Sequence, residues 1–234
     1  MSDDFTLLAV CAGNIHRSAL AAALLERWRT WYLTPALATE VAITSAGFVA
    51  PEGAPMGARA QRIARAFGAD GSMHRASLIS DRAIARAGLV LVATVRQRDE
   101  VLQRDPAALR KTFTMREAGR IAESLEPRDA PRSVADLAAV VAAMADRRHA
   151  GDGSDDIIDP QGLEDDAYLQ MAREEIPALA RLARALFGMP DVEVAAYVHT
   201  AESPEALGED CTALGSEKPS ASLHVTNRRG AVRR

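Results

Sequence analysis

Short apolar runs alternate with longer amphipathic stretches along the first half of the chain. Four runs have the length and composition of strands: FTLLAV at 5–10, VAITS at 41–45, LVLVAT at 89–94 and KTFTM at 111–115. The stretches between them have helical character, at 19–33, 56–67 and 96–104. Strands that alternate with helices are typical of parallel βαβ units, so the pattern predicts an α/β fold.

The pattern changes after the fourth run. A proline-rich loop, EPRDAPR, is followed by apolar residues at helical spacing, which predict an amphipathic helix: Val134, Leu137, Val140, Val141 and Met144. A long helix is expected over 163–187, since Gly188 and Pro190 form a stop signal. Residues 189–234 are rich in Ser, Glu and Gly, and we expect them to be a disordered tail.

Composition narrows the class of protein. The 234 residues carry a net charge of -4, which gives no reason to expect nucleic acid or a membrane surface as partner. No apolar run approaches the length of a membrane span, and the acidic start MSDDF does not resemble a signal peptide, so we expect a cytoplasmic protein. Two cysteines, Cys11 and Cys211, cannot form a disulfide scaffold, and no Cys/His cluster has zinc spacing. We therefore expect neither a metal nor a cofactor.

The candidate chemistry lies in VCAGNIHRSA at 10–19, between the first strand and the first helix. A tight loop there can turn its N–H groups inward and bind an anion at the positive end of the helix, while Arg17 holds two phosphate oxygens. The same field favours the thiolate of Cys11, and Ser18 can donate a hydrogen bond to the sulfur. Considered without the surrounding pattern, Cys11 could equally be a small buried hydrophobic residue, and Arg17 could be a surface residue.

Phosphoryl transfer from an alcohol or phenol also needs a general acid. The best candidate is Asp159 in IIDPQG, which follows two apolar residues and precedes Pro160. Taken alone, an ordinary Asp-Pro turn is the better interpretation.

Together these pieces resemble a known family, the low-molecular-weight protein tyrosine phosphatases, which include bacterial tyrosine phosphatases and related arsenate reductases. The motifs that carry the resemblance occur in order over about residues 5 to 188: VCAGNIHRS, SAG at 45–47, HRASLIS at 74–80, LVLVAT, KTFTMREAGRI at 111–121 and Asp159-Pro160. The resemblance implies a three-layer α/β sandwich with a four-stranded parallel sheet and the phosphate loop after the first strand. It implies a phosphatase domain over 1–188, in which 122–158 is an insertion, a lid or a partner surface.

The resemblance also implies roles for individual residues. Cys11 would be the nucleophile, forming a phosphocysteine, and Asp159 the general acid and then the base for water. The residues implied to cradle phosphate or sulfate are Ala12, Gly13, Asn14, Ile15, His16, Arg17 and Ser18. Asn14, Ser18, Ser45 and His74 would form a hydrogen-bond network that supports the loop. The implied substrate is a phosphoprotein, and tyrosine kinases of polysaccharide export are partners of bacterial members.

Two substitutions set this chain apart from the family pattern. His16 stands where many members have a second cysteine, which excludes protection of the nucleophile by that disulfide. Gln161 stands where many have an aromatic residue that stacks on phosphotyrosine. Arsenate reduction with an external small thiol and non-catalytic binding of a phosphoprotein stay open as alternatives. Phosphoarginine ranks lower, because Ile15 replaces the threonine of the arginine phosphatases.

Overall fold

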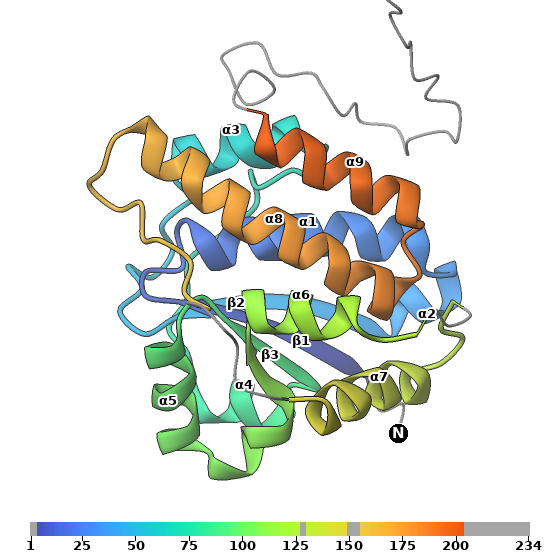
Figure 1. Ribbon diagram of the computed structural model, residues 1–234. Coiled ribbons are helices and arrows are strands. Elements are labelled where there is room, and N and C mark those ends of the chain that lie inside the picture. The colour runs from blue at the N-terminus through green and yellow to red at the C-terminus, as the bar shows by residue number, and fades with distance from the viewer. Residues whose placement is uncertain (1–3, 127–129, 149–154, 204–234) are drawn as a thin grey trace, which may run out of the picture.

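The computed structural model describes residues 4–126, 130–148 and 155–203. Its centre is a four-stranded parallel sheet in the order β2-β1-β3-β4 (Figure 1). The strands are β1 (Phe5–Cys11), β2 (Val41–Gly47), β3 (Leu89–Val92) and β4 (Thr112–Thr114). The predicted α/β class, the parallel sheet and all four strands are confirmed, with ends that shift by one or two residues.

Nine α-helices and one 3-10 helix are formed by the described residues. They are α1 (Arg17–Tyr32), α2 (Pro35–Thr39), α3 (Ala58–Ala66), α4 (Asp81–Arg86), α5 (Val95–Arg104), η1 (Pro106–Lys111), α6 (Met115–Glu123), α7 (Val134–Asp146), α8 (Asp165–Phe187) and α9 (Asp191–Glu202). The short helices α2 and α4 were not predicted, because five or six residues are too few to show a helical period.

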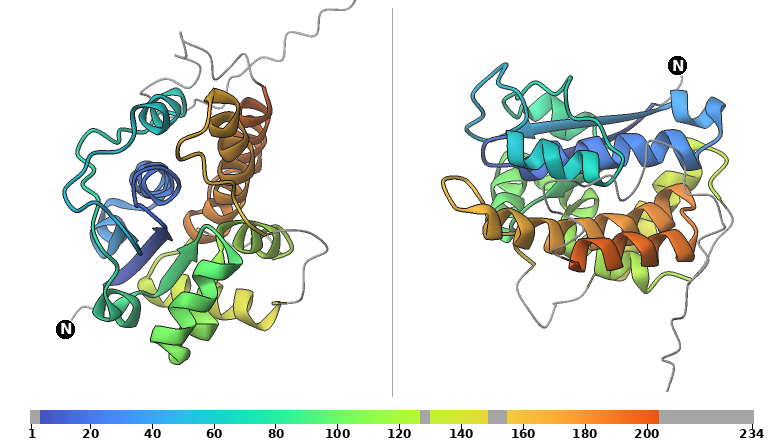
Figure 2. Two further views of the ribbon diagram at one scale, coloured as in Figure 1. Left: turned by 90° about the vertical axis from the view of Figure 1, so that its left-hand side faces the viewer. Right: turned by 90° about the horizontal axis from the view of Figure 1, so that it is seen from above.

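The alternation of side chains along β1 divides the core into two parts. Leu7, Ala9 and Cys11 face a large cluster that contains residues of α1, α6, α7, α8 and α9. Leu8 and Val10 face a smaller cluster against α4 and α5. Helices therefore cover both faces of the sheet, as Figure 2 also shows, and the expected three-layer sandwich is confirmed.

The segment 122–158 contains the predicted helix, α7. It begins with a capping box between Ser133 and Asp136, and its apolar side is buried in the large cluster. Figures 1 and 2 place α7 at the end of the sheet away from the loop that follows β1. The helix α7 thus does not lie over that loop.

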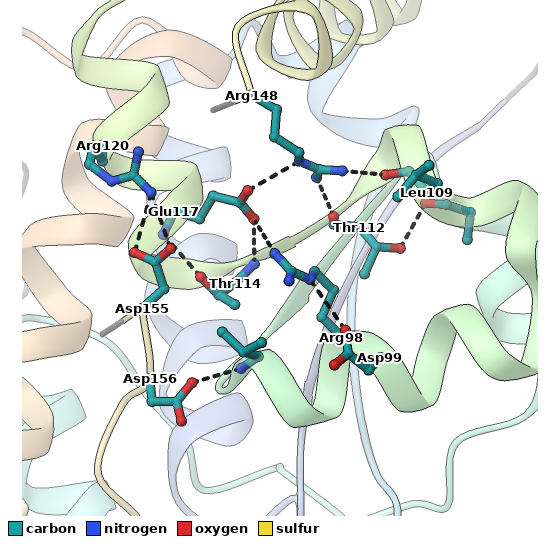
Figure 3. Close-up of polar contacts among 12 residues, drawn as sticks. Arg98, Asp99, Leu109, Thr112, Thr114, Glu117, Arg120, Arg148, Asp155 and Asp156 are labelled. Carbon is teal, nitrogen blue, oxygen red and sulfur yellow. Dashed lines mark hydrogen bonds and ion pairs between the residues drawn. The ribbon is translucent and has the colours of Figure 1, made fainter. Parts of the chain in front are cut away.

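A buried carboxylate ties α7 to the sheet edge. Glu117 of α6, 2% exposed, lies 3.1 Å from Arg148, just beyond α7, and 3.6 Å from Arg98 of α5 (Figure 3). It also accepts a hydrogen bond from the backbone N–H of Thr114, which completes the capping box of α6. Two guanidinium groups and a backbone donor thereby compensate the burial of one negative charge.

The expected tail from 189 begins as an ordered helix instead. The chain leaves α8 through Gly188 at φ 76°, turns at Pro190 and returns as α9. Tyr197 of α9 is 1% exposed, with its ring 4.9 Å from that of Trp28 and 6.1 Å from that of Phe67. The prediction of disorder was wrong for 191–202, because burial of Tyr197 and Ala201 docks this short helix on the rest of the domain. The rest of the expected tail, 204–234, lies outside the described residues.

Candidate active site

The loop between β1 and α1 surrounds the sulfur of Cys11 with hydrogen-bond donors. Cys11 is the last residue of β1 and is 2% exposed. Its Sγ accepts a hydrogen bond from the backbone N–H of Asn14 at 3.2 Å and lies 3.0 Å from the hydroxyl of Ser18. Arg17 begins α1, so the positive end of that helix faces the same loop. Such surroundings favour the binding of an anion in the loop.

Asn14 organises the loop from within. It is fully buried, and its φ of 51° places it in the left-handed region that Asn tolerates better than most residues. Its Nδ2 donates to Ser18 Oγ at 2.9 Å, and its Oδ1 accepts from the backbone N–H of Ser77 at 2.9 Å. His74 Nε2 donates to the carbonyl of Asn14 at 2.7 Å. Because the acceptor is a carbonyl, Nε2 carries the proton, and burial lowers the pKa of His74 below its ordinary value.

Ser45 enters this network through its backbone. The carbonyl of Ser45 accepts a hydrogen bond from the hydroxyl of Ser77 at 3.1 Å, and we find no hydrogen bond of the Ser45 hydroxyl within the described part of the chain. Ser77 therefore links the two segments, since its backbone N–H donates to Asn14 and its hydroxyl to the carbonyl of Ser45. The stretch HRASLIS, in which Ser77 lies, was the only signal in the sequence that pointed to this residue. The orientation of Ser77 depends on the isolated bridge between Gly47 and Leu78, which the sequence does not reveal.

Gly47 permits the loop to lie against β2. A Cβ at this position would be 2.5 Å from the carbonyl oxygen of Ala12 and 2.8 Å from the backbone nitrogen of Asn14. The backbones of the two segments are also joined by hydrogen bonds, from Phe48 N to Cys11 O and from Val49 N to Ala12 O. Only glycine allows this approach.

The predicted acid and the predicted phosphate-binding arginine meet in space. Arg17 is 3% exposed; its Nη2 forms an ion pair and hydrogen bond with Asp159, and its Nη1 donates to the carbonyl of Ile157 at 3.1 Å. The Asp159 side chain is 45% exposed. Residues 142 positions apart are thus in contact at the carboxyl end of β1.

The segment before Asp159 is fixed to α5 and α6. Asp156 Oδ1 accepts from the backbone N–H of Val95 at 2.7 Å, at the start of α5 (Figure 3). The carbonyl of Asp156 accepts from Arg116 at 3.0 Å, and Asp155 forms an ion pair with Arg120 at 3.1 Å. The two acidic residues therefore fix the start of the segment 155–161 around Asp159, which we call the acid loop.

Two further contacts continue this attachment toward Asp159. Ile157 N donates to the carbonyl of Ala93, just beyond β3, at 2.9 Å, and Ile158 N donates to the Glu174 carboxylate of α8 at 2.8 Å. Every residue from 155 to 159 consequently forms a hydrogen bond or ion pair with a residue outside this segment. These contacts restrict the position of the Asp159 carboxylate.

A second carboxyl lies behind Arg17. Glu175 of α8 is fully buried, and we find no hydrogen-bond partner for either of its carboxyl oxygens among the described residues. Burial raises the pKa of Glu175 well above its ordinary value, and the charge of Arg17 opposes that shift. The raised pKa favours the neutral form of Glu175, which does not compete with an anion for the positive charge of Arg17.

His16 and Gln161, the two departures from the family pattern, touch each other. His16 Nε2 lies 2.8 Å from Gln161 Oε1, and the ring of His16 is edge-on to that of Tyr168 at 5.2 Å. Tyr168 therefore packs against His16.

In the described part of the chain no group of three or more His, Cys, Asp or Glu side chains is arranged to hold a metal ion. None of the described helices is long and apolar enough to cross a membrane.

Comparison with known proteins agrees with this geometry. The family model of the low molecular weight phosphotyrosine protein phosphatases matches residues 6–127. A probable low molecular weight protein-tyrosine-phosphatase, EpsP, of Ralstonia nicotianae is 35% identical over 112 residues, which cover 48% of this chain and 71% of that protein. A protein-arginine-phosphatase of Geobacillus stearothermophilus is 34% identical over 113 residues, covering 48% and 70%.

Solved structures show the same fold. The YwlE arginine phosphatase of Geobacillus stearothermophilus aligns with a TM-score of 0.54 and 28% identity, covering 77% of this chain and 91% of that one. The Erwinia amylovora tyrosine phosphatase amsI aligns with a TM-score of 0.54 and 22% identity, covering 77% and 92%. The matched family model and relatives together show that this chain belongs to the low molecular weight phosphotyrosine protein phosphatase family.

Proposed function

We propose that this protein hydrolyses phosphomonoesters of proteins through a phosphocysteine on Cys11. The observation that carries the proposal is the meeting of Cys11, Arg17 and Asp159 at one loop, with the sulfur already in hydrogen-bond contact with Asn14 N and Ser18 Oγ. A nucleophile, an anion-binding fork and a carboxyl group are the parts that phosphoryl transfer requires.

In the first step the thiolate of Cys11 attacks phosphorus. The S–P bond forms as the bond to the leaving oxygen breaks, and protonated Asp159 gives its proton to that oxygen. The guanidinium of Arg17 and the N–H groups of the loop stabilise the charge on the equatorial oxygens.

In the second step water attacks the phosphocysteine. Asp159, now a carboxylate, takes a proton from the water as the new P–O bond forms and the S–P bond breaks. Inorganic phosphate and the thiolate are the products, and Ser18, 3.0 Å from Sγ, stabilises the departing sulfur.

The proposed substrate is a phosphotyrosine protein, because EpsP of Ralstonia bears the name of a tyrosine phosphatase. Phosphoarginine is the second candidate, favoured by the arginine phosphatase of Geobacillus. By family expectation the substrate includes a tyrosine kinase of polysaccharide export. A nucleophilic thiolate must stay reduced, which supports a cytoplasmic location.

The decisive experiment measures release of phosphate from p-nitrophenyl phosphate and from phosphotyrosine, phosphoarginine and phosphoserine peptides. Cys11→Ser should abolish turnover, and Asp159→Asn should lower it by roughly 10²- to 10⁴-fold, the usual range for a general acid. Ser45→Ala is the matched control, since the hydrogen bond of Ser45 to Ser77 is made by its backbone carbonyl, which alanine keeps. Full activity of Cys11→Ser would contradict the mechanism.

The same preparations separate the alternatives. Arsenate-dependent consumption of an external small thiol, without phosphate release, would establish an arsenate reductase. Capture of a phosphopeptide that is never dephosphorylated would establish a binding protein. Cys211, the other cysteine, lies outside the described residues.

A further inference from the structure

We propose that His16 and Gln161 form a bridge across the mouth of the site that keeps Asp159 in place after the substrate has occupied Arg17. The two residues act as positioning residues, and this role rests on the proposed function. The bridge joins the phosphate loop to the acid loop through side chains 145 positions apart in the sequence.

The bridge ends next to both functional side chains. His16 directly precedes Arg17, and its Nε2 lies 2.8 Å from Gln161 Oε1. Because an amide oxygen only accepts, Nε2 carries the proton and donates it. The backbone N–H of Gln161 donates in turn to Asp159 Oδ1 at 3.2 Å. Gln161 is therefore attached to His16 by its side chain and to the acid by its backbone.

The ring of His16 is itself held firmly. Tyr168, 7% exposed, meets it edge-on, and the Tyr168 hydroxyl lies 3.4 Å from Nε2. On the other side, Gly57 approaches so closely that a Cβ there would be 2.4 Å from His16 Cε1. Burial also lowers the pKa of His16, so the imidazole is kept neutral. A fixed ring gives Gln161 a fixed anchor.

The contacts of Arg17 explain why such an anchor is needed. Both arms of its guanidinium are engaged with the acid loop, one with Asp159 and one with the carbonyl of Ile157. A phosphate that takes the fork in bidentate fashion must displace these contacts. The oxygen freed from Arg17 is Oδ2, while Oδ1 stays bonded to the N–H of Gln161.

Two attachments then flank the free carboxyl group. Before it, Ile158 N is bonded to Glu174, and after it, Gln161 is bonded to His16. Without the second attachment, the next contact after Asp159 is the hydrogen bond from Arg59 to the carbonyl of Leu163. The residues next to Asp159 are then held less closely, and Oδ2 spends less time directed at the leaving oxygen. A proton must be transferred over hydrogen-bond distance, so this loss of position lowers the rate.

The test uses three variants: Gln161→Ala, His16→Phe and the double variant. Phenylalanine keeps the packing against Tyr168 and Gly57 but has no Nε2. Gln103→Ala is the control, because Gln103 is an exposed glutamine on α5. The substrates are phenyl phosphate, whose leaving phenol has a pKa of roughly 10 as in tyrosine, and p-nitrophenyl phosphate, whose leaving group needs less help from an acid.

Each single variant should lower kcat/KM on phenyl phosphate by roughly two- to tenfold, the range of one net hydrogen bond. The loss on p-nitrophenyl phosphate should be smaller. The double variant should be no slower than the slower single variant, since both remove one contact. Inhibition by inorganic phosphate should be unchanged, because the bridge acts on the acid loop and not on phosphate binding.

Hydrogen exchange provides a measurement that does not depend on activity. The amides of residues 158–163 should exchange faster in all three variants than in the wild type and in Gln103→Ala. Unchanged exchange, equal losses on both substrates, or losses that multiply in the double variant would each overturn the bridge. A wild type inactive on every substrate but with faster exchange in the variants would refute the proposed function and leave the bridge standing.

Discussion

Replacement of Asn14 by alanine should destabilise the whole domain as well as the loop. The substitution removes the hydrogen bond from Nδ2 to Ser18 Oγ and the bond from the backbone N–H of Ser77 to Oδ1, both 2.9 Å long. It also places alanine at a φ of 51°. All of these changes occur at a fully buried position.

The size of the effect follows from these three losses. Each buried hydrogen bond contributes about 1 kcal/mol net, and the N–H of Ser77 is left without its acceptor. A left-handed backbone costs an ordinary L-residue about 1–2 kcal/mol more than it costs asparagine or glycine. The sum predicts a loss of about 3–4 kcal/mol in the free energy of unfolding. This is a large part of the 5–15 kcal/mol typical of a domain.

Urea unfolding of wild type, Asn14→Ala and Asn14→Gly would measure the loss and divide it between its causes. Glycine also loses both hydrogen bonds and avoids the steric cost of about 1–2 kcal/mol, but it loses about 0.5–1 kcal/mol more backbone entropy on folding. Asn14→Gly should therefore be the more stable variant by up to about 1 kcal/mol. Activity should fall in both, because Ser18 is no longer held at the sulfur. A loss below about 1 kcal/mol in Asn14→Ala, or a less stable glycine variant, would refute the assigned contacts.

Three further predictions concern stability. Gly119→Ala should lower the free energy of unfolding in urea by about 1–3 kcal/mol, since a Cβ would lie 2.6 Å from the Cα and carbonyl oxygen of Ala178 where α6 meets α8. An unchanged urea midpoint would contradict that helix contact. Tyr197→Ala should cost about 3–5 kcal/mol by the same assay, because it empties the site against Trp28; a negligible loss would mean that α9 is not docked. His74 has a lowered pKa, so the unfolded chain binds its proton more readily, and the stability it contributes is lost as the pH falls below about 6.5. His74→Asn should therefore make the free energy of unfolding less dependent on pH between about 5 and 7, and an unchanged slope would refute this.

The sequence was most informative where structure is local. The run before Cys11, the residues at 11–18 and the helix after them are continuous in the chain, so their order fixes strand, loop and helix without help from other segments. The same holds for α7, whose apolar residues recur at the helical period and are buried as predicted. The ends of these elements shifted by a few residues, because caps and strand pairing, rather than periodicity, decide where an element ends.

The helix α9 shows where local pattern fails. Most of its residues are apolar, but they do not gather on one side of the helix, and only Tyr197 and Ala201 are buried. The rings of Trp28 and Phe67, distant in the sequence, make Tyr197 a core residue. Docking against distant aromatic rings supplies the free energy that composition does not reveal.

The sequence by itself determined the fold class and placed Cys11 and Arg17 in one loop between a strand and a helix, because these features depend on residues adjacent in the chain. The tertiary structure decided which distant groups serve that loop. The match to the family model ends at residue 127, and only the path of the chain back along α5 and α6 brings Asp159 to Arg17. The contact of Ser77 with Asn14 and Ser45 and the contact of His16 with Gln161 likewise depend on how separate loops pack together at the carboxyl ends of the strands. Strand order and side-chain packing determine these contacts between distant loops, and neither produces a periodic pattern in the sequence.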